Sequence, residues 1–132
     1  MLAYCTYCSA EKNYTNKSIS AIKLYKSERI SNVHKEAQAN NIQMFILSGK
    51  YGVISAQHKI NYYDHLLKAE EVDMHSELVT NQLKELGIRE LVFFSNKLEN
   101  DNNLAPYHSC IKRACNNAGI KLTIEESNYI DW

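Results

Sequence analysis

Residues Leu86-Gly87-Ile88-Arg89-Glu90-Leu91 and Ala118-Gly119-Ile120-Lys121-Leu122 follow the same pattern, and they decide the fold class. In each stretch an apolar helical pattern ends at a glycine, which is followed by an isoleucine, a charged residue and an apolar run. Glycine adopts the left-handed conformation that ends many helices, and short turns of this kind lead from a helix into a strand. The two junctions therefore predict an α/β fold with a parallel sheet.

The spacing of apolar residues extends this pattern to the rest of the chain. We expect strands over residues 2–7, 42–47, 91–94 and 120–124, and helices over 21–37, 72–86 and 105–118, the last with Pro106 in its first turn. A further short helix is expected near residues 65–69. The pattern predicts one domain over residues 1–132, a small three-layer α/β sandwich with about four mostly parallel strands. The aromatic tail Tyr129-Ile130-Asp131-Trp132 either closes this fold or contacts a second subunit.

Composition narrows the class of protein. The chain has 15 basic and 15 acidic residues, and the N-terminal part is basic while the C-terminal part is acidic. No apolar stretch approaches the roughly 20 residues of a membrane span, and the N-terminus lacks the pattern of a signal peptide. We expect a cytoplasmic protein without a membrane segment. A neutral overall charge also argues against a uniformly basic nucleic-acid binder.

The chain has four cysteines, of which Cys5 and Cys8 have the C-x2-C spacing of zinc ligands. Cys110 and Cys115 lie five positions apart on an expected helix, so their side chains point to different faces. We therefore expect free thiols, no metal site and no cofactor.

The segment Ser48-Gly49-Lys50-Tyr51-Gly52 follows a buried apolar run. Positive φ angles at Gly49 and Gly52 would turn several amides toward one point, beside the charge of Lys50. Such a loop suits an anion or a polar small molecule. The alternative is a tight turn at the end of a strand with a solvated lysine. The spacing differs from that of a phosphate-binding P-loop.

Ligands of open parallel sheets bind beyond the carboxyl ends of the strands. In this chain, polar residues follow three expected strands, namely Cys8, Ser9 and Lys12, then residues 48–52, then Ser95, Asn96 and Lys97. We expect a site where these loops meet.

An ordered set of motifs carries a resemblance to a known family. The set consists of Cys8-Ser9 with Lys12, Leu24-Tyr25 with Ser27, Ser48-Gly49-Lys50-Tyr51-Gly52, and Tyr63-Asp64. It resembles a bacterial and phage domain of unknown function related to the YaaA-like peroxide-stress proteins, with their C-S-x-x-K, S-[AG]-K-Y-G and P-Y-D motifs. The resemblance covers about the first half of the chain. It departs at the last motif, where this chain has Ile60-Asn61-Tyr62 and no proline.

The resemblance implies a nucleotide, a nucleoside or a nucleic-acid base as ligand, because YaaA-like proteins are associated with DNA and related domains modify or exchange bases. An enzyme acting on such a ligand, through N-glycosidic or base-modification chemistry, is the first hypothesis. The alternatives are a non-catalytic binder of a small nucleotide-derived ligand and a DNA-associated stress protein. The expected partner is thus a small nucleotide-like ligand or a nucleic acid.

The candidate residues fall into a catalytic group and a ligand-binding group. Ser48 and Asp64 are the catalytic candidates, with Asp64 orienting a ribose hydroxyl or assisting bond cleavage, or else capping a helix. Ligand-binding candidates are Cys8, Ser9, Lys12, Ser48, Gly49, Lys50, Tyr51, Gly52 and Tyr63. The two tyrosines either stack on a base or pack at the edge of the core. Cys8 could also be a nucleophile, with His58 as the plausible base.

Overall fold

A computed structural model describes residues 1–127, and its centre is a five-stranded sheet in the order β4-β3-β1-β6-β7. The strands are β1 (Leu2–Tyr7), β3 (Gln43–Ser48), β4 (Gly52–Ser55), β6 (Glu90–Asn96) and β7 (Lys121–Ser127). β1 pairs in parallel with β3 and β6, and β6 with β7, whereas β4 runs antiparallel to β3. Two short strands, β2 (Ile19–Ser20) and β5 (Lys59–Ile60), pair separately.

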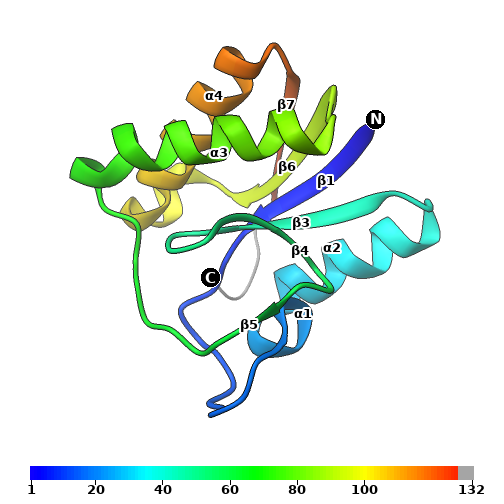
Figure 1. The fold of residues 1–132 in the computed structure, drawn as a ribbon, viewed down its shortest axis with the longest axis vertical. Helices are drawn as coiled ribbons and strands as arrows, with labels where there is room; N and C mark the ends of the chain where they lie inside the picture. The colour runs from blue at the N-terminus through cyan, green and yellow to red at the C-terminus, as the bar shows by residue number, and fades with distance from the viewer. Residues whose placement is uncertain (128–132) are drawn as a thin grey trace.

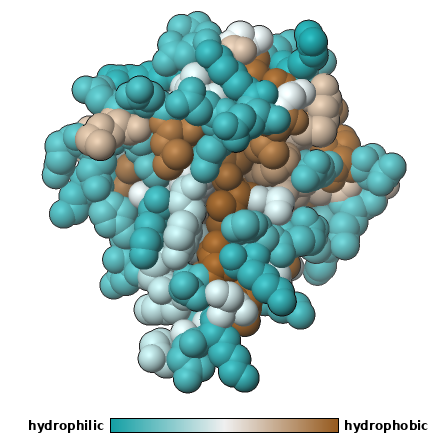
Figure 2. All heavy atoms as spheres, viewed as in Figure 1, coloured by the Kyte–Doolittle hydropathy of each residue, from teal (hydrophilic) through white to brown (hydrophobic). Residues whose placement is uncertain are grey.

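Helices cover both faces of the five-stranded sheet (Figure 1). They are α1 (Ala21–Leu24), α2 (Glu28–Ala39), α3 (Val72–Leu86) and α4 (Ala105–Ala118), with 3-10 turns η1 (Ala69–Glu71), η2 (Leu98–Asn100) and η3 (Asn102–Leu104). α3 and α4 pack together on one face, and α2 packs against β1 and β3 on the other. On the side seen in Figure 2, polar residues form most of the surface and hydrophobic ones show through in a central band. The prediction of a three-layer α/β sandwich is confirmed.

The two glycine junctions have the expected geometry. Gly87 and Gly119 end α3 and α4 with φ angles of 70° and 69°. Both helices and β1 have the predicted bounds, and Pro106 lies in the first turn of α4. Because each glycine turns the chain back along the sheet, the following strand joins in parallel.

Other elements differ from the expectation. The single helix over residues 21–37 is wrong, because Ser27 interrupts it and its Oγ caps α2 by accepting the Ile30 amide at 3.1 Å. The short helix near residues 65–69 is also wrong, since the first helical turn there, η1, begins at Ala69. The Leu67 amide donates instead to Tyr107 Oη, at 3.1 Å. The antiparallel strand β4 was not expected.

Two expectations remain, one for the C-terminal tail and one for membrane-spanning segments. The tail Tyr129-Ile130-Asp131-Trp132 lies outside the described residues. Between Met1 and Ser127, no helix combines the length and the apolar character that a membrane span requires.

Candidate functional site

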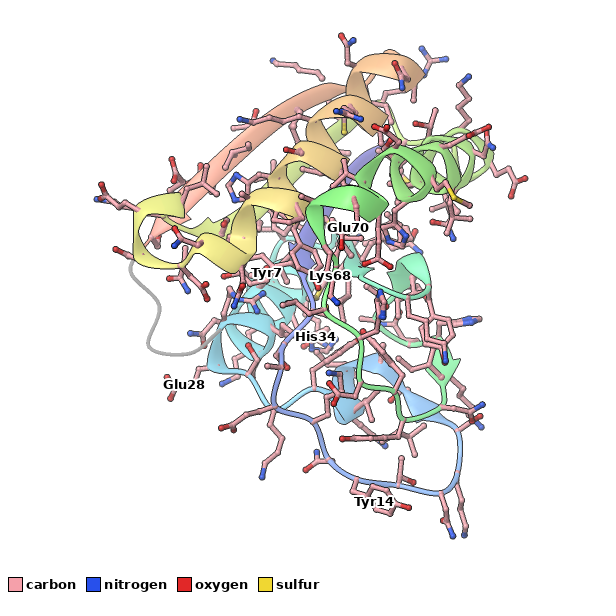
Figure 3. The ribbon with its side chains drawn as sticks, turned by 90° about the vertical axis from the view of Figure 1, so that its left-hand side faces the viewer. Tyr7, Tyr14, Glu28, His34, Lys68 and Glu70 are labelled. Atoms are coloured by element: carbon pink, nitrogen blue, oxygen red, sulfur yellow. The ribbon has the colours of Figure 1, made fainter. Side chains whose placement is uncertain are left out.

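The carboxyl ends of β1 and β3 are crossed by residues 61–68, the segment that leads from β5 toward α3. Tyr63 Oη lies 2.8 Å from Ser48 Oγ at the end of β3, and Leu67 is held by Tyr107 of α4. Figure 3 shows Lys68 and Glu70 at the turn into α3. The crossing segment therefore forms one wall of any site at this edge of the sheet.

A groove of about 440 Å³ opens beside the crossing segment, and we call it the strand-edge groove. It is lined by Gly49, Lys50, Tyr63, Asp64, His65, Glu71 and His75. A second, smaller cavity of about 40 Å³ is lined by Cys8, Ser9, Ala10, Lys12, Asp64, His65, Leu66 and Tyr107. The two spaces share Asp64 and His65, so they adjoin each other. The volume of the groove is in the range of small-molecule sites, about 300–1,000 Å³.

Ser48 lies beneath the groove and is fully buried. Its Oγ accepts the amides of Lys50 and Tyr51, at 3.1 and 3.0 Å, and donates to Tyr63 Oη. Tyr63 Oη in turn lies 2.6 Å from Tyr25 Oη. Burial raises the pKa of both tyrosines well above their usual range, so both remain neutral phenols. The amides expected to face a ligand are thus used inside the loop.

The two glycines of the loop serve different purposes. Gly52 has a φ of 76°, as expected. The expectation of a positive φ at Gly49 is wrong, because this residue is needed for close packing instead. A Cβ at position 49 would lie 3.0 Å from the backbone of both His65 and Leu67. The absence of a side chain therefore lets the crossing segment approach β3.

His65 and Glu71 form a pair that the sequence interpretation missed. His65 Nε2 lies 3.1 and 3.0 Å from the two carboxylate oxygens of Glu71. The Lys68 amide donates to Glu71 at 2.9 Å and, with the adjacent His65, holds the pKa of that carboxyl below its usual value. An ionised carboxylate only accepts, so Nε2 donates, and Nδ1 carries no proton whenever the ring is neutral. Glu71 thereby orients the His65 ring through Nε2, and the His65 side chain is 39% exposed.

A second histidine, His75, lines the groove, and two lysines, Lys50 and Lys12, supply positive charge nearby. His75, in the first turn of α3, donates from Nε2 to the Ser48 carbonyl oxygen at 2.8 Å. Lys50 Nζ lies 5.3 Å from the ring centroid of Tyr51, and Lys12 Nζ lies 4.8 Å from that of Tyr63. Positive charge thus flanks the groove on the side of β3 and the small cavity on the side of β1.

Cys8 lies in the small cavity and is 3% exposed. Its Sγ lies 3.5 Å from Tyr107 Oη. Its backbone is fixed by Arg29, a fully buried residue that donates to the carbonyl oxygens of Tyr7 and Cys8, at 2.6 and 3.3 Å. The guanidinium also stacks over the Tyr7 ring at 3.6 Å. Arg29 therefore sets the path of the chain where β1 ends, near the labelled Tyr7 in Figure 3.

The structure brings most of the candidate residues together. Gly49, Lys50, Tyr63 and Asp64 line the groove, while Cys8, Ser9, Lys12 and Asp64 line the small cavity. The exposed Asp64 caps no helix, because the turn before α3 has Lys68 at its N-cap.

The other candidates lie apart from the groove. Tyr51 packs its ring edge-on against Tyr63 and borders a different hollow, together with His58. Gly52 begins β4 against Gln82. Ser95 and Asn96 are buried inside β6 rather than in a loop. His58 therefore does not share the cavity of Cys8.

The cysteines are free thiols. Among residues 1–127, no group of three or more His, Cys, Asp or Glu side chains is arranged to hold a metal ion. Within this part of the chain, Cys5 and Cys8 thus have no further side chains beside them that would complete a zinc site.

Comparison with known proteins gives one family. A family of unknown function, DUF6884, matches residues 5–98, which include the end of β1, the crossing segment and all of β6. No curated protein and no solved structure shows a significant match. The relation to the YaaA-like proteins stays a prediction. Because the match spans well over half of its length, this chain belongs to DUF6884, a family of unknown function.

Proposed function

We propose that the protein is an enzyme that binds a nucleoside, a nucleotide or a nucleobase in the strand-edge groove and uses His65 as a general base. The observation that carries this proposal is the His65–Glu71 contact at the wall of the groove. A carboxylate that fixes the tautomer of a histidine and leaves its other nitrogen free is a recurrent arrangement in acid–base catalysis.

Recognition of the ligand follows from the charges around the groove. Lys50 is exposed and offers an ammonium group to a phosphate, and Asp64 is exposed and offers a carboxylate to sugar hydroxyls or to an exocyclic amine. Tyr63 is only 4% exposed and its hydroxyl bonds to Ser48, so it closes the groove rather than stacking on a base. A ligand with a base, a sugar and an anionic group matches these features.

The chemistry we propose begins with proton transfer to His65 Nδ1 from a water or from the ligand. Deprotonated water then attacks the sugar carbon of an N-glycosidic bond, the carbon–nitrogen bond breaks, and the departing base takes the proton from His65. Asp64, which lines the same groove, stabilises positive charge that develops on the sugar. Ser48 has no place in this step, because its proton already goes to Tyr63 and its lone pairs to two amides.

The second candidate function is a non-catalytic binder of the same ligand class. It is favoured because the loop amides of Lys50 and Tyr51 already donate to Ser48 Oγ, so they are not available as donors to a ligand in the groove. The two functions differ in the effect of removing His65, which a binder would tolerate.

Mass spectrometry of mixtures with nucleobases, nucleosides and nucleotides separates these functions. Native spectra report complexes and denaturing spectra report products. We expect Lys50→Ala to weaken binding of phosphate-bearing ligands by about tenfold or more. His65→Gln should keep binding and lose turnover by about 10²-fold or more.

Two control variants are matched to these changes. Lys59→Ala removes an exposed lysine on β5, and His58→Gln removes an exposed histidine that lines neither the groove nor the small cavity. Both should behave as the unaltered chain. The proposal fails if no member of the three ligand classes binds, and the binder is supported if ligands bind and leave unchanged.

A further inference from the structure

Cys8 and His65 come from different parts of the chain and line the same cavity of about 40 Å³. We propose that Cys8 is a nucleophile with His65 as its base and Glu71 as the positioning residue, and that it accepts an acyl group from an ester or amide carried by the ligand. The identity of that ligand rests on the proposed function above. The reactivity of the thiol does not.

The groove and the small cavity are suited to different parts of the ligand. The small cavity shares Asp64 and His65 with the groove, and its volume of about 40 Å³ exceeds the roughly 10–15 Å³ that a water molecule requires. That space accommodates a carbonyl group and leaves the body of a ligand in the groove. His65 lines both spaces, and we assign it the transfer of the thiol proton to a leaving group.

Hydroxyl groups around Cys8 are suited to stabilise a thiolate. Tyr107 Oη lies 3.5 Å from Sγ and already accepts the Leu67 amide, so its own proton can turn toward a negatively charged sulfur. Burial, and next to it the neighbouring Cys8, raise the pKa of Tyr107, Tyr25 and Tyr63. All three phenols therefore stay protonated, and Tyr107 is the one whose contact with Cys8 Sγ lets it donate to the thiolate. Lys12 lines the same cavity and adds positive charge.

The other three thiols lack this setting. Cys5, Cys110 and Cys115 are buried and line neither the groove nor the small cavity. Burial raises the pKa of Cys110 and of Cys115 to about 12, and it raises the pKa of Cys5 further. These three cysteines are inert at neutral pH and serve as internal references for Cys8.

The acyl group passes from the ligand to Cys8 and then to water. His65 Nδ1 takes the thiol proton, Sγ bonds to the carbonyl carbon, and the carbon–oxygen or carbon–nitrogen bond of the ester or amide breaks. The leaving alcohol or amine takes the proton from His65. Water, deprotonated by His65, then hydrolyses the thioester, which releases the carboxylic acid and restores the Cys8 thiol.

Two probes test this proposal on the full chain. Iodoacetamide alkylates thiolates, and peptide mapping gives the rate at each cysteine. p-Nitrophenyl acetate donates an acetyl group, and the mass of the intact chain reports the acyl-enzyme. We expect one adduct per folded chain with each probe, at Cys8, and none in Cys8→Ser. His65→Gln should slow both reactions at pH 7 by about tenfold or more.

The pH dependence of the alkylation rate tests whether Glu71 positions His65. Glu71→Gln removes the charge that favours a protonated His65, so it should shift the midpoint of the pH–rate profile of alkylation and leave the folded fraction unchanged. His58→Gln is the matched control and should alter neither rate nor midpoint. Both substituted side chains of the pair are more than a third exposed, so folded variants are expected.

The outcomes separate this inference from the proposed function. The inference is overturned if Cys8 reacts no faster than Cys110 and Cys115, or if His65→Gln leaves its rate unchanged, whatever binds in the groove. Nucleosides that fail to bind while Cys8 reacts as described overturn the proposed function alone. An acyl-enzyme that forms as well in Cys8→Ser as in the unaltered chain overturns the covalent route and leaves the proposed function intact.

Discussion

Ser48 Oγ donates a hydrogen bond of 2.8 Å to Tyr63 Oη, and this contact joins the end of β3 to the crossing segment. Tyr63 Oη is also 2.6 Å from Tyr25 Oη, just beyond α1. Two contacts thus tie together three parts of the chain beside the groove. A buried hydroxyl network with its partners in place fixes such segments in one arrangement.

Tyr63→Phe removes the shared hydroxyl. Ser48 then loses an acceptor and Tyr25 a partner in a buried setting, so we expect a loss of about 1–3 kcal/mol in the free energy of unfolding. Urea denaturation followed by circular dichroism measures it. Tyr62→Phe is the matched control, since Tyr62 is 40% exposed and should change stability by less than about 0.5 kcal/mol. Equal stabilities for the two variants would contradict the role given to this network.

Much of the fold could be predicted because its signals are local. Gly87 and Gly119 mark the ends of α3 and α4, and the helical spacing gives both helices their bounds. The break between α1 and α2 was missed because apolar spacing continues through it, while the cap at Ser27 depends on the side chain folding back. β4 was missed because four residues carry too little periodicity to indicate a strand.

The site was only partly predictable, for a physical reason. Gly49, Lys50 and Asp64 were found because polar residues follow strands that end at one edge. The pairing of His65 with Glu71 depends on the extended path of residues 61–68, which Tyr107 of α4 helps to hold from 40 positions away in the chain. No spacing rule within the segment reports such a distant contact.

Gly49→Ala tests the close approach of the crossing segment. The added Cβ would lie 3.0 Å from the backbone of His65 and Leu67 and from Tyr107 Oη, so backbone must move. We expect a loss of about 1–3 kcal/mol in the free energy of unfolding, together with weaker ligand binding. Gly87→Asn is the control, because a Cβ there meets nothing within 4 Å and asparagine tolerates its φ of 70°. If Gly49→Ala unfolds at the same urea concentration as the unaltered chain, the packing argument is wrong.

Arg29→Lys tests the anchor of the Cys8 backbone. An ammonium group cannot reproduce the planar stacking over Tyr7 or the separate bonds to the carbonyls of Tyr7 and Cys8. We expect a loss of roughly 2–4 kcal/mol in the free energy of unfolding, measured by thermal and urea denaturation. Arg113→Lys gives the comparison, since its ion pair with Asp73 is exposed and should change stability by less than about 0.5 kcal/mol. A loss no larger than that of Arg113→Lys would show that the guanidinium shape is not required.

His108 should make stability depend on pH. Burial, with Lys112 adding to it and Glu126 opposing it, holds the pKa of His108 below its usual value. The unfolded chain then binds more protons than the folded chain at mildly acidic pH, so stability falls as the pH drops below about 6.5. His108 Nε2 donates to Ser95 Oγ at 2.7 Å, because the serine proton goes to the Asn96 carbonyl.

Urea denaturation at several pH values measures this effect of His108. His108→Gln keeps a neutral donor and cannot titrate, so we expect a smaller loss of stability between pH 7 and pH 5 than in the unaltered chain. The exposed His58, changed to glutamine, should leave the full pH dependence in place. The assignment is wrong if His108→Gln retains the same slope of unfolding free energy against pH, since the protons taken up on unfolding would then bind elsewhere.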